Sequence, residues 1–311
     1  MSGVGEKSEV AGGHGRSEED RVAMTQETTA HRVAVVGGGV MGSGIAALVL
    51  GHGIPVVVVD VDQEMLDDAR ARITHQLRHA QLMGVLPVGR APGELGTTVS
   101  LADTAEATAV IEAVTESPAV KAKVLAEVSA VVRPGTPLIT NTSGIPVSEL
   151  AASTARPEDL IGTHFMNPPY LIRMVEVSRG PRTADTTVAS VVALLTAVTR
   201  RAVLVQDAPG FVTSRLLHPM INAAARIVAE GTATVEAVDE LMEGCLGHPT
   251  GPLRTADLIG LDNLADSLAE LHERTGDEAC KPCDLLLAKV RGGELGRKSG
   301  RGFYVYGKDM A

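Results

Sequence analysis

A glycine-rich turn between two apolar runs constrains the fold of this chain more than any other feature. The run Arg32–Val36 has the continuous apolar character of a buried strand, and the apolar segment Met41–Leu50 has the length of a helix. Between them lie three glycines in the pattern G-x-G-x-x-G: Gly37, Gly39 and Gly42. These residues are therefore predicted to fold as a strand, a tight turn and a helix.

Each glycine of this pattern has its own role in binding a dinucleotide. Gly37 permits the turn, Gly39 lets the backbone approach a pyrophosphate, and Gly42 allows the helix to pack closely on the strand. The phosphates are expected at the helix N-terminus, beside Val40 and Met41, where free N–H groups and the helix dipole favour negative charge. The turn is therefore predicted to bind a cofactor.

An acid follows the second apolar run, Pro55–Val59. The Asp60 carboxylate would accept hydrogen bonds from the adenosine ribose hydroxyls and would repel a 2′-phosphate, which favours NAD over NADP. In a chain with 33 glycines the alternative is ordinary turn chemistry. The combination of strand, helix and correctly placed acid makes that alternative the weaker one.

Composition excludes several classes of protein. A chain of 311 residues is long enough for two domains, and 44% hydrophobic with 21% charged residues is ordinary for a globular protein. Glycines, a histidine and a proline interrupt the apolar region 33–59, so no membrane span is predicted. The net charge of −10 argues against general affinity for nucleic acid.

The N-terminal segment and the cysteines indicate a cytoplasmic protein. Residues 1–30 lack the apolar core of a secretory signal and the arginines of a transit peptide, so we expect a flexible extension. Three cysteines, Cys245, Cys280 and Cys283, are too few for a disulfide framework. No second cysteine pair accompanies the C-K-P-C sequence at Cys280–Cys283, so ordinary thiols are predicted and no metal site.

Alternating strand and helix patterns continue to residue 206. Further strands are predicted at Val110–Val114, Leu138–Thr140, Ile161–Phe165, Met174–Val177 and Ala202–Val205, and further helices at Gln63–Gln81, Ala119–Val132 and Asp185–Thr199, with 84–96 as a loop. This alternation predicts an α/β fold with a Rossmann-type, doubly wound parallel sheet. Four helices are expected beyond it: Phe211–Glu230, Val235–Leu246, Ala256–Arg274 and Cys283–Gly292. We expect an NAD-binding domain over 31–206 and an all-α domain over 207–311 for substrate and dimerisation.

A histidine and a glutamate occupy two neighbouring predicted strands. His164 lies near the end of one strand, and Glu176 lies in the next. An imidazole can accept an alcohol proton as hydride leaves the same carbon, and a carboxylate on its other nitrogen fixes the tautomer and stabilises the imidazolium. Most histidines and acids are structural or solvated, but the position of this pair in a dinucleotide fold favours catalysis.

Two more polar positions follow predicted strands. Asn141 and Ser143 come at the carboxyl end of a strand, where open α/β sheets bind ligands, so Ser143 is a candidate to hydrogen-bond the reacting oxygen. The equally weighted alternative is a loop whose side chains satisfy turn backbone groups. Glu116 is a candidate to orient ribose or His164, the alternative being a charge at the N-terminus of the next helix.

Seven motifs occur in one order along the chain: G-G-G-V-M-G-S-G-I-A (Gly37–Ala46), E-A-V-T-E (Glu112–Glu116), N-T-S (Asn141–Ser143), T-H-F-M-N-P-P (Thr163–Pro169), V-E-V (Val175–Val177), A-P-G-F-V-T-S-R-L-L (Ala208–Leu217) and G-R-K-S-G-R-G-F-Y (Gly296–Tyr304). From about Arg32 to Tyr306, the chain resembles the short-chain L-3-hydroxyacyl-CoA dehydrogenases, which include bacterial 3-hydroxybutyryl-CoA dehydrogenases. The resemblance implies NAD-dependent oxidation of a 3-hydroxyacyl thioester to its 3-oxo form by a homodimer whose helical domain helps to close the cleft.

The resemblance also implies roles for individual residues. His164 would be the general base and Glu176 its partner, with Ser143 and Asn167 at the substrate oxygens. The positions implied near the cofactor are Glu116, Lys121 and Asn141, and Lys121 matches a basic position used near the thioester carrier.

The chain departs from the family pattern at Ser214, where P-G-F-x-x-N-R usually has Asn beside the substrate. Together with P-P-Y-L-I (Pro168–Ile172), H-P-T-G-P (His248–Pro252) and D-L-I-G-L-D-N-L (Asp257–Leu264), this residue is similar to a polyketide-pathway subgroup. Those members oxidise a glyceryl or hydroxyacyl group on an acyl carrier protein for methoxymalonyl extender units. The expected carrier is therefore either CoA or an acyl carrier protein.

Two weaker interpretations exist. The β-hydroxyacid dehydrogenases open with a similar turn but use a catalytic lysine. A non-catalytic NAD-binding structural protein would not need both His164 and Glu176.

Overall fold

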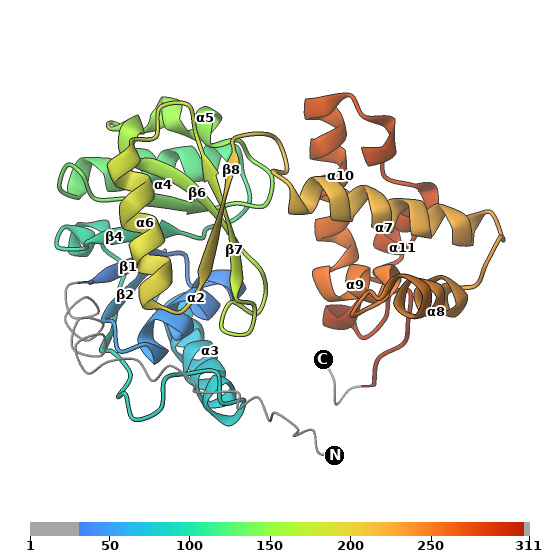
Figure 1. Cartoon of the computed structure of the whole chain (residues 1–311), viewed down its shortest axis with the longest axis horizontal. Coiled ribbons are helices and arrows are strands. Elements are labelled where there is room, and N and C mark those ends of the chain that lie inside the picture. The colour runs from blue at the N-terminus through green and yellow to red at the C-terminus, as the bar shows by residue number, and fades with distance from the viewer. Residues whose placement is uncertain (1–30, 308–311) are drawn as a thin grey trace, which may run out of the picture.

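An eight-stranded sheet forms the larger part of the molecule, and a cluster of helices follows it (Figure 1). The computed structural model describes residues 31–307, so the expected N-terminal extension lies outside the described residues. The strand order is β3-β2-β1-β4-β5-β6-β7-β8. The strands are β1 (Val33–Val36), β2 (Val56–Val59), β3 (Leu95–Thr98), β4 (Ala109–Glu112), β5 (Leu138–Asn141), β6 (Leu160–Phe165), β7 (Met174–Arg179) and β8 (Arg201–Gln206). This confirms the predicted Rossmann-type α/β fold with a helical C-terminal part.

Helices cover both faces of the sheet and make up the C-terminal part (Figure 1). Those packed on the sheet are α2 (Val40–Gly51), α3 (Gln63–Leu82), α4 (Pro118–Val131), α5 (Val147–Leu150) and α6 (Asp185–Ala197). Those beyond it are α7 (Thr213–Ala229), α8 (Val235–Leu246), α9 (Pro252–Ile259), α10 (Leu261–Thr275) and α11 (Asp284–Arg291). Over residues 31–307, none of these helices has the length and apolarity that crossing a membrane requires.

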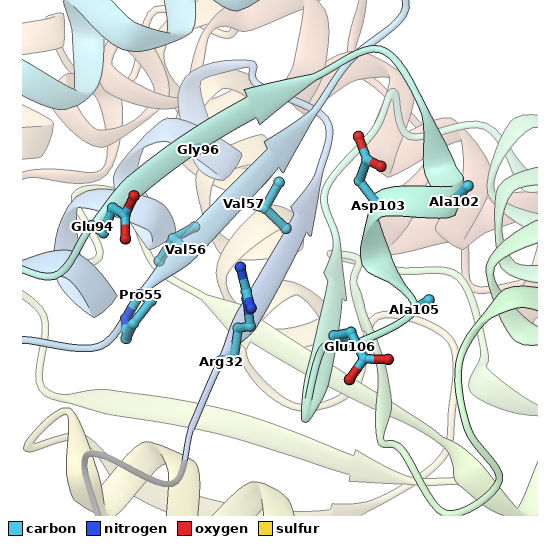
Figure 2. Close-up of a pocket in the computed structure, with 10 residues that line it drawn as sticks. All are labelled: Arg32, Pro55, Val56, Val57, Glu94, Gly96, Ala102, Asp103, Ala105 and Glu106. Atoms are coloured by element: carbon cyan, nitrogen blue, oxygen red, sulfur yellow. The ribbon is translucent and has the colours of Figure 1, made fainter.

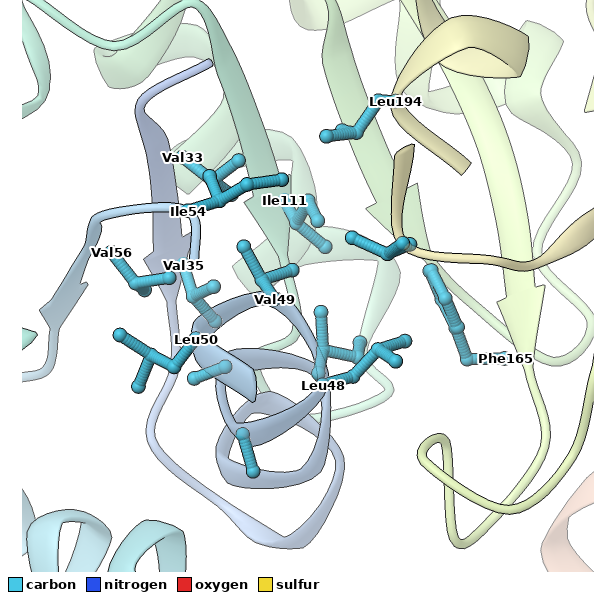
Figure 3. Close-up of a cluster of buried hydrophobic side chains, with 14 of the residues drawn as sticks. Val33, Val35, Leu48, Val49, Leu50, Ile54, Val56, Ile111, Phe165 and Leu194 are labelled. Carbon is cyan, nitrogen blue, oxygen red and sulfur yellow. The ribbon is translucent and has the colours of Figure 1, made fainter. Parts of the chain in front are cut away.

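Two independent packing layers explain the continuous apolar strands. Successive side chains of β1 point to opposite faces, so Val33 and Val35 join a core formed with α2, α3 and α6 (Figure 3). Ala34 and Val36 join a second core, formed with α4 and α5 on the other face. Burial on both faces is typical of parallel sheets flanked by helices, and it removes the polar alternation of a one-sided strand.

The prediction of an entirely parallel sheet was wrong at its last two strands, β7 and β8. β7 runs antiparallel to β6, whereas the other pairings are parallel. The physical reason is the short connection: residues 166–173 are too few for the crossover that a parallel neighbour needs.

Two other elements differ from expectation. β3 occupies part of the segment expected to be a loop, because its sequence Leu-Gly-Thr-Thr carries little apolar signal and it lies at the sheet edge. The single helix expected over Ala256–Arg274 is two helices, α9 and α10. They are separated at Gly260, whose φ of +94° lies in the region that favours glycine.

Candidate active site

The turn after β1 forms a backbone cradle at the start of α2. Gly37 has φ of +100°, and a Cβ added there would lie 2.6 Å from the Ala113 carbonyl oxygen. A Cβ on Gly42 would lie 1.8 Å from the Gly37 carbonyl oxygen, so helix and turn pack without room for a side chain. At Gly39, by contrast, an added Cβ would meet no atom of the described chain within 4 Å.

This cradle fits the pyrophosphate of a dinucleotide. Among the described residues, no side chain caps the N-terminus of α2, and its first turn carries no acid. The helix dipole and the N–H groups near Val40 and Met41 therefore favour an anion in the open space beside Gly39.

Asp60 connects the end of β2 to this turn. Its Oδ2 accepts a hydrogen bond from the Gly38 N–H at 2.6 Å, and its Oδ1 accepts one from the Val61 N–H at 2.7 Å. The side chain is half-buried, and a carboxylate has about four lone-pair sites. Acceptor capacity therefore remains for ribose hydroxyls.

His164 and Glu176 are directly opposite each other in the antiparallel pair β6–β7. This register puts both side chains on one face of the sheet, with 3.3 Å between His164 Nδ1 and Glu176 Oε2. Burial would raise the pKa of Glu176, but hydrogen bonds from His164, Thr213 and the Val212 N–H outweigh it and lower the pKa. Glu176 is therefore ionised at neutral pH, beside a half-buried imidazole.

Thr213, which the sequence analysis did not select, bridges this pair. Its hydroxyl lies 2.7 Å from Glu176 Oε2 and 3.2 Å from His164 Nδ1. The Val212 N–H donates to the other carboxylate oxygen at 2.7 Å. Because Val212 and Thr213 lie at the start of α7, the helical part of the chain supplies hydrogen bonds to a pair whose two residues lie in the sheet. The only sequence signal was their place within the A-P-G-F-V-T-S-R-L-L motif.

Glu116 organises the loop after β5. Its Oε1 accepts hydrogen bonds from the Thr142 hydroxyl at 2.5 Å, the Ser143 N–H at 2.7 Å and the Ser143 hydroxyl at 3.2 Å. Burial would raise the pKa of Glu116, but the charge of Lys121 and these hydrogen bonds lower it. The ionised carboxylate thus holds Ser143, and no hydrogen bond joins it to His164 in the part of the chain described.

Lys121 differs from its expected role near the cofactor and carrier. The side chain is fully buried, and its Nζ lies 2.8 Å from Glu112 Oε1 and 3.2 Å from Glu116 Oε2. It also donates to the Asn141 carbonyl at 3.2 Å. A lysine enclosed by these acceptors has no surface to offer an outer ligand, so it braces Glu116 and the β5 loop from within.

The site thus has two clusters, one of His164, Glu176 and Thr213 and the other of Glu116, Ser143 and Lys121. The remaining predicted residues lie around them. Asn141 pairs with Thr163 in the β5–β6 ladder, and its Oδ1 accepts from the Phe165 N–H at 3.2 Å, which brings the β5 loop beside His164. Asn167 is exposed just after β6, before a cis peptide bond to Pro168. Ser214 is buried in the first turn of α7, next to Thr213.

A hollow of about 420 Å³ elsewhere on the sheet is not part of this site (Figure 2). Its lining includes Arg32, Pro55 and Glu94, each of which immediately precedes a strand. The hollow therefore lies at the amino ends of β1, β2 and β3, whereas open α/β sheets bind ligands at the carboxyl ends.

Comparisons with known proteins match both parts of the chain. The family model "3-hydroxyacyl-CoA dehydrogenase, NAD binding domain" matches residues 32–208, and "3-hydroxyacyl-CoA dehydrogenase, C-terminal domain" matches residues 210–306. A Bacillus subtilis protein named "Probable 3-hydroxybutyryl-CoA dehydrogenase" is 41% identical over 278 residues, covering 88% of this chain and 97% of that protein.

Two solved structures have the same fold over most of their length. FadB2 of Mycobacterium tuberculosis has a TM-score of 0.85 at 39% identity, covering 89% of this chain and 99% of that one. (S)-3-hydroxybutyryl-CoA dehydrogenase PaaH1 of Ralstonia eutropha has a TM-score of 0.81 at 36% identity, with coverage of 89% and 99%.

Proposed function

The chain belongs to the 3-hydroxyacyl-CoA dehydrogenase family of NAD-dependent oxidoreductases, and from this premise we propose that His164 is its general base and Glu176 the partner of that base. The observation that carries the proposal is the 3.3 Å contact between His164 Nδ1 and the ionised Glu176 carboxylate. NAD, when bound, accepts the hydride that leaves C3 of the substrate.

The geometry supports a specific proton path. With Nδ1 directed at Glu176, Nε2 is the nitrogen that takes the C3 hydroxyl proton. Glu176 favours the tautomer with a proton on Nδ1 and stabilises the imidazolium that forms. Ser143, held by Glu116, and Asn167 would bind the substrate oxygens. The reverse reduction uses the same groups.

We propose 3-hydroxybutyryl-CoA as the substrate, because relatives of similar length carry that name. A second candidate is a glyceryl or hydroxyacyl group on an acyl carrier protein, in the polyketide-pathway role described above. The observation that favours it is Ser214, a short side chain buried in the first turn of α7 where the family pattern usually has Asn.

The first experiment compares NADH formation with 3-hydroxybutyryl-CoA and with glyceryl and 3-hydroxybutyryl groups on an acyl carrier protein. Turnover of the CoA ester supports acyl-CoA metabolism, whereas turnover only on the carrier protein supports the biosynthetic role. In either case His164→Ala should reduce kcat by about 10²–10⁴-fold, with NADH binding nearly unchanged. No turnover with any of these thioesters would contradict the proposal.

A further inference from the structure

Three arginines lie together where β7 and β8 begin. Arg173 immediately precedes β7, Arg200 immediately precedes β8, and Arg201 is the first residue of β8. The Arg201 N–H donates to the Arg173 carbonyl at 2.8 Å, so the two strands begin side by side, on the side of the sheet nearest the helical part (Figure 1). Over residues 31–307, no carboxylate forms an ion pair with any of the three. In a chain with a net charge of −10, these residues form a positive patch that no acid neutralises.

One of these arginines already has partners, and two do not. Arg200 is buried and donates to the carbonyl oxygens of Pro169 at 3.0 Å and Tyr170 at 2.7 Å. Burial and the charge of Arg173 lower the pKa of Arg200 to about 10, so it remains a cation at neutral pH. Arg173 and Arg201 are exposed, and neither side chain forms a hydrogen bond within the described part of the chain. Their guanidinium groups are therefore available to an anionic ligand.

Strand register places Arg201 on the same face of the sheet as the proposed acid–base pair. Arg201 is opposite Met174 in the β7–β8 ladder, and Met174 is two residues before Glu176. Paired residues, and residues two apart in one strand, point to the same face. A strand spacing of ~4.8 Å and a rise of ~3.3 Å per residue put the Cα atoms of Arg201 and Glu176 about 8 Å apart. Because β7 is antiparallel to β6, this patch also lies at the sheet edge where β6 ends, close to His164.

Exposed apolar side chains lie between the arginines and the acid–base pair. Met174 is 44% exposed, and Val203, which is opposite Glu176 in the β7–β8 ladder, is 39% exposed. A weakly polar ligand arm can lie over such side chains and end in an anion. The carriers of acyl thioesters have this composition, because in CoA and in acyl carrier proteins a pantetheine arm separates the thioester from a phosphate. Lys121, the cation expected near the carrier, is buried and cannot reach that phosphate.

We propose that Arg173 and Arg201 bind the phosphate of the substrate's carrier, with the pantetheine arm lying over Met174 and Val203. This inference rests on the proposed function and adds to it the residues that recognise the carrier. A guanidinium group offers paired N–H donors that match phosphate oxygens, and its charge strengthens each hydrogen bond. The phosphate lies a pantetheine arm away from the reacting carbon, so these arginines contribute to binding and not to proton or hydride transfer.

The test compares three thioesters with the same acyl group: 3-hydroxybutyryl-pantetheine, which has no phosphate, 3-hydroxybutyryl-CoA, and the 3-hydroxybutyryl group on an acyl carrier protein. We expect Arg173→Gln/Arg201→Gln to raise KM about 10–100-fold for a phosphate-bearing thioester with kcat nearly unchanged, because the lost contacts are equal in ground and transition states. KM for the pantetheine ester should stay the same. The matched control is Arg182→Gln/Arg291→Gln, which removes the same charge from two exposed arginines elsewhere.

The pattern of KM changes identifies the source of the phosphate. A rise for the CoA ester alone assigns the site to the nucleotide phosphates of CoA, and a rise for the carrier-protein ester, alone or with the CoA ester, assigns it to the phosphate of the arm. Unchanged KM for both, or an equal rise for the pantetheine ester, overturns the inference. Calorimetric titration of CoA and of pantetheine into the protein with NADH does not need turnover. If CoA binding depends on the two arginines but no thioester is turned over, the proposed function fails and the phosphate site stands.

Discussion

At the scale of single residues, the site depends on carboxylates whose charge is maintained in spite of burial. Glu176 is held by hydrogen bonds from His164, Val212 and Thr213, and Glu116 by Lys121 and the β5 loop. In each case, several hydrogen bonds hold one ionised carboxylate in a fixed orientation. Oriented anions in turn fix the side chains that would touch substrate.

The lowered pKa of Glu176 predicts a specific pH dependence of stability. Because the folded-state pKa lies below the ordinary value of 4.5, the ionised carboxylate stabilises the fold above that value, and this contribution is lost as pH falls through the folded-state pKa. Glu176→Gln should therefore weaken the acid dependence of Tm. Circular dichroism melts from neutral to acidic pH measure this, with exposed Glu240→Gln as the control that keeps the wild-type slope.

Lys121 predicts an asymmetric pair of substitutions. Lys121→Met leaves the buried Glu112 carboxylate without its cation and should lower the free energy of unfolding by about 3–5 kcal/mol. Adding Glu112→Gln should recover part of the loss, since the uncompensated charge is gone. Urea unfolding measures both variants. Lys123→Met, exposed on the same helix, should change stability little, and an equal loss there would contradict the role assigned to Lys121.

At the scale of elements, the β1–α2–β2 unit was predictable because its signals are local. Strand, turn glycines and acid follow one another along the chain, and the structure reproduces them. The facing of His164 and Glu176 was predicted, but the antiparallel direction of β7 was not, although the short connection to it was visible in the sequence.

The roles of Thr213 and Lys121 could not be predicted in the same way. Thr213 is 37 residues from its partner Glu176, and Lys121 is 9 residues from its partner Glu112. Only the folded structure brings these residues together. Nothing in the periodicity of α4 distinguishes Lys121 from the exposed Lys123. The break at Gly260 was missed because apolar spacing continues across it.

In the turn between β1 and α2, we expect opposite effects from substituting Gly39 and Gly42. Gly39→Ala puts a methyl group into open space where the pyrophosphate would lie, so the Kd for NADH should rise at least about tenfold while Tm stays nearly constant. Gly42→Ala forces a clash with the Gly37 carbonyl and should destabilise the fold by about 2–4 kcal/mol. Fluorescence titration and thermal melts separate the two effects. Similar losses of stability in both variants would contradict the assignment of the cradle.

At the scale of the whole molecule, the two parts of the chain are joined by specific contacts. Arg274 on α10 forms an ion pair with Glu149 on α5, and the Gly210 N–H donates to Gly144. The helical part has its own apolar core, which includes Ile221, Leu253 and Leu268. It can therefore keep its shape while supporting the sheet.

Exposed apolar side chains on α8 predict self-association. Leu241 and Leu246 are 58% and 67% exposed, so α8 offers apolar surface to the homodimer that the family resemblance implies. If these residues form the interface of the proposed homodimer, the protein should sediment as a dimer and Leu241→Asp should shift it toward monomer. Leu82→Asp, an exposed leucine on α3, is the control. A wild-type monomer in sedimentation velocity would refute the proposed homodimer.

Because Val212 and Thr213 contact Glu176, the two halves of the candidate site depend on different segments of the chain. The nucleotide cradle is built from the first third of the chain, whereas the proposed acid–base pair is held in place by residues at the start of α7, two-thirds of the way along. A fragment that ended after the sheet would keep the nucleotide cradle but would lose the hydrogen bonds from Val212 and Thr213 that hold Glu176.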